Sequence, residues 1–274
     1  MRKTKIEVME IMKNNNKEEG EFVLPMDTLK IFKLNNEKID NFNLLMNKFG
    51  KFKKFSKKFD KKINNFNFSV FGKLIEKIKK DYYGKIEKIS LYLKFFEGEV
   101  QGRMVVGLGG PSVYEASMTL HHIYGLPYIP GQALKGMLRN YVILNFFSSE
   151  DEALKDKEFC KIFGDKENKG EVLFFDAFPI DRINIKRDVI NVHYKEYYEG
   201  KSAPCDNLNP KPIFFYTVEN TKFKFVIGSK KNMENYKIMG NGLLKLFKEA
   251  LENQGVGAKT SVGYGYFSVS NMKE

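Results

Sequence analysis

Apolar side chains recur at helical spacing in two segments of the chain, and each segment predicts a helix with one buried face. The first covers 132–147 and follows a break at Pro130–Gly131. The second covers 242–253, and Gly255 stands where a helix C-terminal glycine belongs. In the first predicted helix one face is shared by Leu134, Met137, Leu138, Tyr141, Val142 and Asn145. In the second, the predicted buried side consists of Leu243, Leu246, Phe247, Ala250 and Leu251.

Alternating and continuous apolar runs predict strands around these helices. Ile89, Leu91 and Leu93 alternate in the first run, before a glycine-punctuated loop over 98–111. A charged helix over 150–163 is also expected, and Glu219-Asn220-Thr221 predicts a hairpin between two neighbouring strands. The expected strands are 86–96, a short piece over 120–124, 171–178, 212–218, 222–227 and 266–269.

The order strand–helix–strands–helix–strand indicates an α+β fold with a ferredoxin-like sheet, the shape that RNA-recognition domains also use. The amino-acid composition and the hydrophobic pattern change near residue 85, which predicts two parts, 1–85 and 86–274. The first part is rich in Lys, Asn and Phe, and it is expected to be helical and packed on the second.

Four phenylalanines of the first part recur at spacings of three, three and four, which predicts an amphipathic helix over 46–62. They are Phe49, Phe52, Phe55 and Phe59. The favoured interpretation is a helix that packs this stripe on the main domain and leaves its lysines in solvent. The alternative is that the lysines follow the phosphates of a nucleic acid.

Charge favours a polyanionic partner, since the formal net charge is +12 and the pI about 9.3. A high content of Lys, Asn, Ile and Phe is also typical of genomes with AT-rich codons, which weakens the inference of a polyanionic partner from charge. Cys160 and Cys205 lie far apart without metal-ligand spacing, so we expect no metal, no cofactor and a reducing, cytoplasmic environment. No run approaches the roughly 20 apolar residues of a membrane span, so no membrane association is expected.

Lys135 and Arg139 are four residues apart and share one helical face beside the apolar stripe. Lys135 lies in the first turn, where free N–H groups and the helix dipole favour an anion. A cation suits this position only if an anion is present, which makes phosphate binding plausible. The alternative is two solvated charges. Gly136, inside the predicted helix, indicates close approach of another group.

The segment Gly255–Gly265 holds four glycines, with a lysine and two hydroxyl side chains between them. Such a loop can lie flat against a phosphodiester backbone, because glycine has no side chain to hold it away. The alternative is a chain of tight turns that begins the last strand. A P-loop is excluded, because Met137 replaces its lysine in the first segment and the second follows a helix and precedes a strand.

Three histidines, His121, His122 and His193, are the natural acid–base candidates of a ribonuclease. His121 and His122 would face opposite ways on a strand. His193 lies in the polar and aromatic segment 191–198, which suits an RNA contact. For all three, a structural or RNA-contact role is favoured over catalysis.

The segments IPGQALKGMLR (129–139) and GVGAKTSVGYGYF (255–267) together resemble the RAMP superfamily of CRISPR-associated proteins. Segments 107–131, 191–198 and 210–227 extend the resemblance over about residues 86–270, although Gln132 stands where the family usually has serine. The resemblance implies a ferredoxin-like RAMP core with insertions and a C-terminal glycine-rich loop. It also implies a subunit without nuclease activity in a type III-B CRISPR (Cmr) effector complex for antiviral defence.

By the same resemblance, the protein contacts the 3′-proximal part of the CRISPR RNA and neighbouring subunits of the complex. The alternative is a RAMP-type, metal-independent endoribonuclease that processes CRISPR RNA, with His193 or His122 as its base. The candidate RNA-contact residues are Lys135, Arg139, His193, Gly255, Gly257, Lys259, Thr260, Ser261, Gly263 and Gly265.

Overall fold

The computed structural model describes residues 9–10, 22–24, 41–47, 52–53, 69–112, 116–192, 197, 199–200, 203 and 211–270. The chain divides into two compact units that interleave along the sequence. One combines Met1–Asn67, Gly109–Leu126 and Arg187–Phe215, and the other Phe68–Leu108, Pro127–Lys186 and Tyr216–Glu274. Interleaved units do not mark a domain boundary in the sequence, so the division at residue 85 stays a prediction.

The larger unit is built on an antiparallel sheet with the strand order β13-β4-β10-β6, and β7 also pairs with β10. Its register places Phe96 opposite Phe225 and Gly98 opposite Val269. Mixed α/β architecture with antiparallel pairing is therefore confirmed. The strands are β4 (Tyr92–Gln101), β6 (Val172–Phe174), β7 (Phe178–Pro179), β10 (Lys222–Ser229) and β13 (Tyr266–Ser270).

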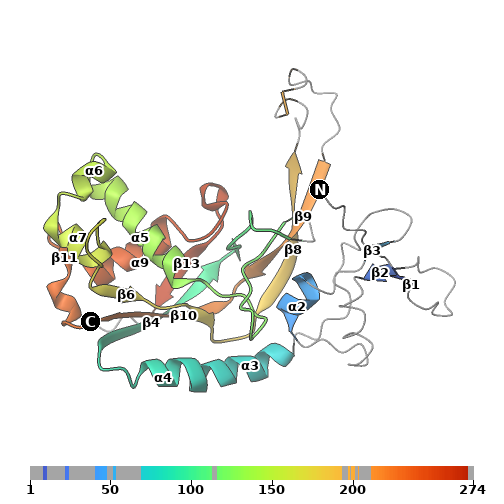
Figure 1. Cartoon of the computed structure of the whole chain (residues 1–274), viewed down its shortest axis with the longest axis horizontal. Coiled ribbons are helices and arrows are strands. Elements are labelled where there is room, and N and C mark those ends of the chain that lie inside the picture. Colours follow the sequence, from blue (N-terminus) through green and yellow to red (C-terminus); the bar gives the residue numbers. More distant parts are fainter. Residues whose placement is uncertain are drawn as a thin grey trace, which may run out of the picture. The chain divides into compact units, whose positions relative to one another are not determined.

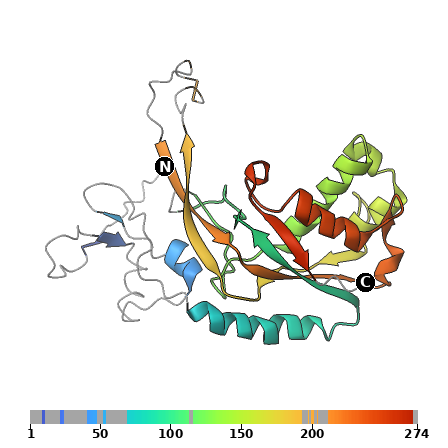
Figure 2. The same ribbon diagram turned by 180° about the vertical axis from the view of Figure 1, so that it is seen from behind.

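Helices cover both faces of this sheet (Figure 1). Helices α5 (Gly131–Phe146) and α9 (Leu243–Asn253) lie on one face, and their bounds confirm the two predicted helices. A continuous helical run lies on the other face, which Figure 2 shows from behind. It consists of α3 (Val70–Ile78), the π-helical turn η1 (Lys79–Tyr83) and α4 (Gly84–Ile86).

The core between the sheet and α9 is aromatic. Phe225 of β10 stacks on Phe96 of β4, with 5.3 Å between ring centroids, and meets Phe267 of β13 edge-on at 5.4 Å. Phe247 of α9 lies edge-on to Phe96 at 5.2 Å. All four rings are buried. The helical spacing in α9 and the alternation of side chains in the strands direct these rings into one aromatic cluster.

Tyr83 joins the opposite helical layer to the sheet. Its hydroxyl donates to the Lys224 carbonyl (2.7 Å) and accepts from the Phe178 amide (3.0 Å). Burial of the phenol raises the pKa of Tyr83 far above its ordinary value. The hydroxyl therefore stays protonated and ties the helical layer to two strands, β7 and β10.

The remaining described elements include two strands of nine residues and several shorter pieces. A further sheet has the order β5-β9-β8, and another the order β1-β2-β3. None of the helices among the described residues is both long and apolar enough to cross a membrane. The remaining bounds are β1 (Met9–Glu10), β2 (Phe22–Leu24), α2 (Phe42–Asn47), β3 (Phe52–Lys53), β5 (Arg103–Met104), α6 (Glu150–Ala153), α7 (Lys157–Phe163), β8 (Asn184–Val192), β9 (Lys211–Glu219), η2 (Met233–Asn235), β11 (Lys237–Ile238), β12 (Asn241–Gly242) and η3 (Thr260–Val262).

The predicted hairpin across 219–221 is wrong, because β9 and β10 run on in the same direction. Both pair antiparallel with one continuous partner segment, in which Arg103 lies opposite Glu219 and Glu99 opposite Lys222. The ladder bends where Gly102 and Asn220 take positive φ values of 73° and 41°. A turn signal here marks a bend between two sheets rather than a reversal.

Other predicted bounds also need correction. The first strand begins at Tyr92, since 84–86 still belongs to a helix, and it continues through Gly98. The charged helix is divided into α6 and α7, because the Asp156 carboxylate accepts from the Phe159 amide (2.7 Å) and begins a new helix. The strand predicted over 171–178 is likewise divided into β6 and β7.

Two predictions for the smaller unit need correction as well. The piece over 120–124 is largely a turn, closed by the Gly125 amide on the His121 carbonyl (2.6 Å). Of the helix predicted over 46–62, two residues end α2 and Phe52–Lys53 form β3, so the helix is wrong there. The rest of that range lies outside the described residues.

Candidate nucleic-acid interface

Helix α5 begins against the sheet at a tightly packed glycine. A Cβ added to Gly131 would lie 2.1 Å from the Phe174 carbonyl oxygen, so only glycine fits there. The Gly131 amide donates to Asp176 Oδ1 (2.7 Å). The anion that the first turn of α5 favours is thus supplied by the chain itself. Because the Asp176 carboxylate supplies this negative charge, the helix end no longer requires a phosphate. Sequence reasoning missed the contribution of Asp176.

Arg139 turns away from the start of the helix. Its guanidinium pairs with Glu150 Oε1 (2.7 Å) at the first residue of α6 and lies 5.3 Å from the ring centroid of Phe159. Its side chain keeps 27% of its accessible surface. Arg139 therefore contributes to the packing of α6 and α7 on α5.

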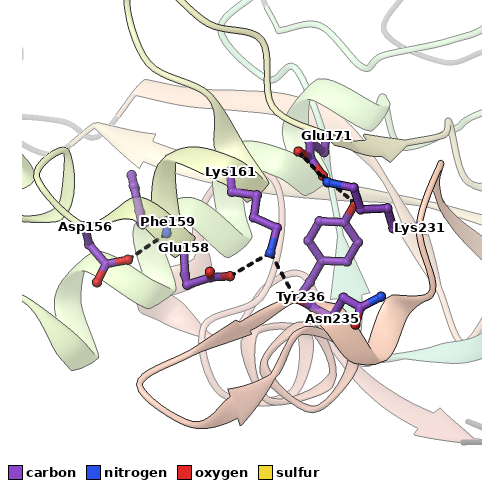
Figure 3. A network of polar contacts seen from close by, with 8 residues as sticks. All are labelled: Asp156, Glu158, Phe159, Lys161, Glu171, Lys231, Asn235 and Tyr236. Carbon is purple, nitrogen blue, oxygen red and sulfur yellow. Dashed lines mark hydrogen bonds and ion pairs between the residues drawn. The ribbon is translucent and has the colours of Figure 1, made fainter.

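Two further basic residues belong to a network at α7, which Figure 3 shows. Lys161 Nζ lies 3.1 Å from Glu158 Oε2 and donates to the Asn235 carbonyl (3.2 Å). Lys231 Nζ lies 3.1 Å from both oxygens of the Glu171 carboxylate. The hydrogen bond from Lys231 lowers the pKa of Glu171. These lysines have partners within the chain.

Lys135, by contrast, lines a cleft of about 600 Å³ beside the start of α5. Lys166 and Lys169 line the same cleft from the loop between α7 and β6. No carboxylate among the described residues forms an ion pair with any of these three lysines. The other lining residues are Gly131, Gln132, Phe163, Asp165, Glu167, Asn168, Gly170, Val172, Leu173 and Phe174.

The loop that carries Lys166 and Lys169 is a fixed turn. Asp165 Oδ1 accepts from the amides of Asn168 (2.7 Å) and Glu167 (2.8 Å), and these hydrogen bonds lower the pKa of Asp165. The side chains of Lys166 and Lys169 are exposed at its surface. Sequence reasoning missed both lysines, although the charged run DKENKG after a predicted helix was a signal of an exposed basic turn.

The glycine-rich segment 255–265 is folded tightly against its own chain. The Val256 amide donates to the Gly265 carbonyl (2.9 Å), and the Gly265 amide to the Arg103 carbonyl (2.8 Å). A Cβ on Gly265 would lie 2.1 Å from the Val256 oxygen, and one on Gly257 would lie 2.4 Å from the Val105 oxygen. The close approach that these glycines permit is made to backbone within the protein.

The outer part of the same segment is open to solvent. Lys259 has a left-handed backbone (φ 62°), and its Nζ lies 4.7 Å from the ring centroid of Tyr264. The turn η3 follows, and Ser261, Val262 and Gly263 are exposed at its tip. Gly255 and Gly265 are buried. The segment therefore presents a short exposed tip on a rigid base.

The two predicted contact segments adjoin neighbouring helices, α5 and α9. Tyr141 of α5 donates to Glu249 of α9 (3.3 Å), and the glycine-rich segment begins directly after α9. Lys135 and Arg139 are not brought to one site, since they face the cleft and α6 respectively.

Two of the three candidate histidines, His121 and His122, lie among the described residues. His193 lies outside the described residues. His121 and His122 do not face opposite ways, because they lie in a turn and their rings stack with 5.0 Å between centroids. Among the described residues there is no group of three or more His, Cys, Asp or Glu side chains placed to hold a metal ion.

Comparison with known proteins matches residues 97–268 to the family model of the RAMP superfamily. The chain is 33% identical to the CRISPR system Cmr subunit Cmr6 of Pyrococcus furiosus, over 70% of this chain and 72% of that protein. It is 30% identical to the CRISPR system CMR subunit Cmr6 of Saccharolobus solfataricus, over 76% of this chain and 68% of that protein.

Among solved structures, the chain is similar to a chain in the cryo-electron microscopy structure of the type III-B Cmr-β complex bound to cognate target RNA. The TM-score is 0.59 at 25% sequence identity. The match covers 72% of this chain and 66% of that one.

Proposed function

Because the chain belongs to the Cmr6 family of the RAMP superfamily, we propose that it is a non-catalytic, RNA-binding subunit of a type III-B CRISPR effector complex. In this role it contacts the 3′-proximal part of the CRISPR RNA and neighbouring subunits in antiviral defence. It acts in the cytoplasm without a cofactor. The observation that carries the proposal is the similarity to a chain of the Cmr-β complex with bound target RNA.

The core is a ferredoxin-like sheet in this proposal. Its support is the strand order β13-β4-β10-β6, in which the first and third of these four strands along the chain, β4 and β10, lie in the middle, and the second and last, β6 and β13, lie at the edges. Helix α5 connects β4 to β6 along the chain, and α9 connects β10 to β13. This order matches the βαββαβ arrangement of the ferredoxin-like motif and supports that part of the proposal.

The RNA backbone binds at the cleft of Lys135, Lys166 and Lys169 in this proposal. Its support is the charge balance around the chain. Arg139, Lys161 and Lys231 pair with carboxylates within 3.1 Å, whereas the three cleft lysines have no such pair among the described residues. RNA phosphates are the natural counterions of lysines that form no ion pair with a carboxylate of the described chain.

The glycine-rich segment supplies a second contact through its exposed members Gly257, Ser261 and Gly263 and its half-buried members Lys259 and Thr260. The buried Gly255 and Gly265 act by shaping the base on which that tip stands. Rigidity of the base lowers the entropy lost when the tip binds a backbone.

The test of the cleft is RNA affinity measured against salt concentration. In the variant K135A/K166A/K169A, the slope of log affinity against log salt falls by about 2, since each contact with single-stranded RNA contributes about 0.7. The control K73A/K77A/K80A removes three lysines from α3 and η1 and keeps the wild-type slope. Equal slopes in both triple variants contradict the proposed cleft.

The alternative function is a RAMP-type endoribonuclease with His122 or His193 as the base. Purified protein is incubated with CRISPR repeat RNA in the presence of a chelator. Our proposal expects intact RNA. Cleavage that is lost in H122A or H193A identifies an enzyme instead.

A further inference from the structure

The turn at residues 121–125 of the smaller unit carries a row of stacked rings, His122, His121 and Tyr124, named here the aromatic row. The His121 ring lies 5.0 Å from that of His122 at an interplanar angle of 20°. It lies 4.8 Å from the ring of Tyr124 at 26°. Three flat side chains are thus stacked within four consecutive positions.

Side chains at the start of α2 hold this turn. Asn41 Nδ2 donates to the carbonyls of His122 (3.2 Å) and Ile123 (3.0 Å). Asn43 Nδ2 donates to the Leu120 carbonyl (3.3 Å). Gly125 has a positive φ of 68°, and a Cβ there would lie 2.4 Å from Asn41 Oδ1, so the turn fits its support only with glycine.

The middle ring is also fixed in rotation. His121 Nδ1 accepts from the Tyr124 amide (3.3 Å), which needs an unprotonated Nδ1 and restrains rotation of the ring. The row is therefore built before any ligand arrives, and a ligand that stacks on it orders few side chains.

The row is open at one end. His122 is exposed, and so is its neighbour Ile123, at 66% of its accessible surface. Aromatic rings in a core lie in apolar contact, whereas this row ends in an imidazole that offers both a π face and ring nitrogens. A nucleobase matches both features, with a flat face for stacking and polar edges for hydrogen bonds.

We propose that the aromatic row is a base-stacking platform for single-stranded RNA, with His122 as the contacting ring. The inference rests on the proposed RNA-binding function and adds a base contact to the backbone contacts described above. Stacking accepts every base, so the platform adds affinity without reading sequence.

The test uses the full chain and a short single-stranded RNA, with affinity measured by fluorescence anisotropy. H122A binds at least about fivefold more weakly than the wild type, because stacking on an aromatic side chain contributes about 1–3 kcal/mol per base. H122F keeps a flat ring and binds within about twofold of the wild type. Because His122 is exposed in a turn, circular dichroism melts of both variants match the wild type.

A second measurement locates the base. RNAs with a single abasic nucleotide are scanned along the sequence. One position weakens binding to the wild type about as much as H122A does, and has no further effect on H122A. 2-Aminopurine at that position loses fluorescence on the wild type but not on H122A.

The outcomes separate the two proposals. Unchanged affinity in H122A, with salt-dependent RNA binding by the wild type intact, overturns the platform alone. Equal loss in H122A and H122F, or no abasic position that couples to His122, also overturns it. No RNA binding by the wild type overturns the proposed function together with the platform.

Discussion

The Gly131 amide donates a 2.7 Å hydrogen bond to the Asp176 carboxylate, and these residues lie 45 positions apart in the chain. The bond fixes the start of α5 on the segment between β6 and β7. It also satisfies one of the free N–H groups of the helix end with a negative charge. The position of α5, and hence of Lys135 at the cleft, depends on this contact.

Removing the Asp176 carboxylate destabilises the protein. We expect D176A to lower the free energy of unfolding by about 1.5–3 kcal/mol, because a hydrogen bond to a charged group is lost and an amide is left without its partner. D176N keeps an acceptor oxygen and loses less. Urea unfolding measures both. The control D181A removes an exposed carboxylate that, among the described residues, bonds only to the amide of the next residue, and it changes stability by less than about 0.5 kcal/mol.

Two glycines in one helix respond in opposite directions to alanine. G131A places a Cβ 2.1 Å from a backbone oxygen, so we expect a loss of about 1–3 kcal/mol. At Gly136, no described atom outside the neighbouring backbone of α5 lies within 4 Å of the added Cβ, so G136A stabilises α5 by up to about 1 kcal/mol. Thermal unfolding of the two variants checks the sign, and a stabilised G131A would contradict the packing of α5 on β6.

Tyr83 makes stability depend on alkaline pH. Burial raises the folded-state pKa of this phenol, so the folded state holds the proton more tightly than the unfolded chain does. The stability that the protonated Tyr83 hydroxyl contributes is fully present below about pH 10, the ordinary pKa of a phenol, and is lost as pH rises above that value. We expect Y83F to cost about 1–3 kcal/mol at pH 7, because the Phe178 amide loses its acceptor.

The measurement is urea unfolding of wild type and Y83F between about pH 8 and pH 11, a window that spans the ordinary pKa of a phenol. The stability difference between the two proteins shrinks as pH rises above that pKa. A constant difference over that range contradicts a buried, protonated Tyr83.

Two glycines of the C-terminal loop distinguish the effect of backbone strain alone from that of strain combined with a steric clash. Gly265 and Gly263 both have positive φ values, 76° and 91°, so alanine strains either backbone by about 1–2 kcal/mol. Only at Gly265 does the Cβ also meet a backbone oxygen, at 2.1 Å. G265A therefore lowers the unfolding temperature more than G263A does. Equal melting temperatures would show that the loop base is looser than its hydrogen bonds indicate.

Helices α5 and α9 were predicted from the sequence with bounds within one residue, because their signals are local. In α9, Leu243, Leu246, Phe247, Ala250 and Leu251 lie on one face by the helical period alone, and all five are buried. The final strand and the terminal glycine at 255 follow from equally short-range signals. The family resemblance rested on such segments and is confirmed by the comparisons.

Strand partners and charge partners were decided by the tertiary structure. Whether 219–221 reverses the chain depends on which strand lies beside it. Here Arg103 lies opposite Glu219 and Glu99 lies opposite Lys222, so one partner segment follows the chain past the bend. Whether a basic residue is available to RNA depends on which carboxylate lies beside it in space. Lys135 and Arg139 look equivalent in the sequence, but Glu150 neutralises only Arg139.

The sequence by itself determined helices α5 and α9, the glycine-rich segment and membership of the RAMP superfamily, because periodicity and short motifs need no knowledge of distant residues. The tertiary structure alone decided that Asp176 caps α5, that Lys166 and Lys169 share a cleft with Lys135, and that His121 and His122 stack. The physical reason is range: hydrogen bonds, ion pairs and ring contacts join groups that are close in space, and chain position does not fix that distance.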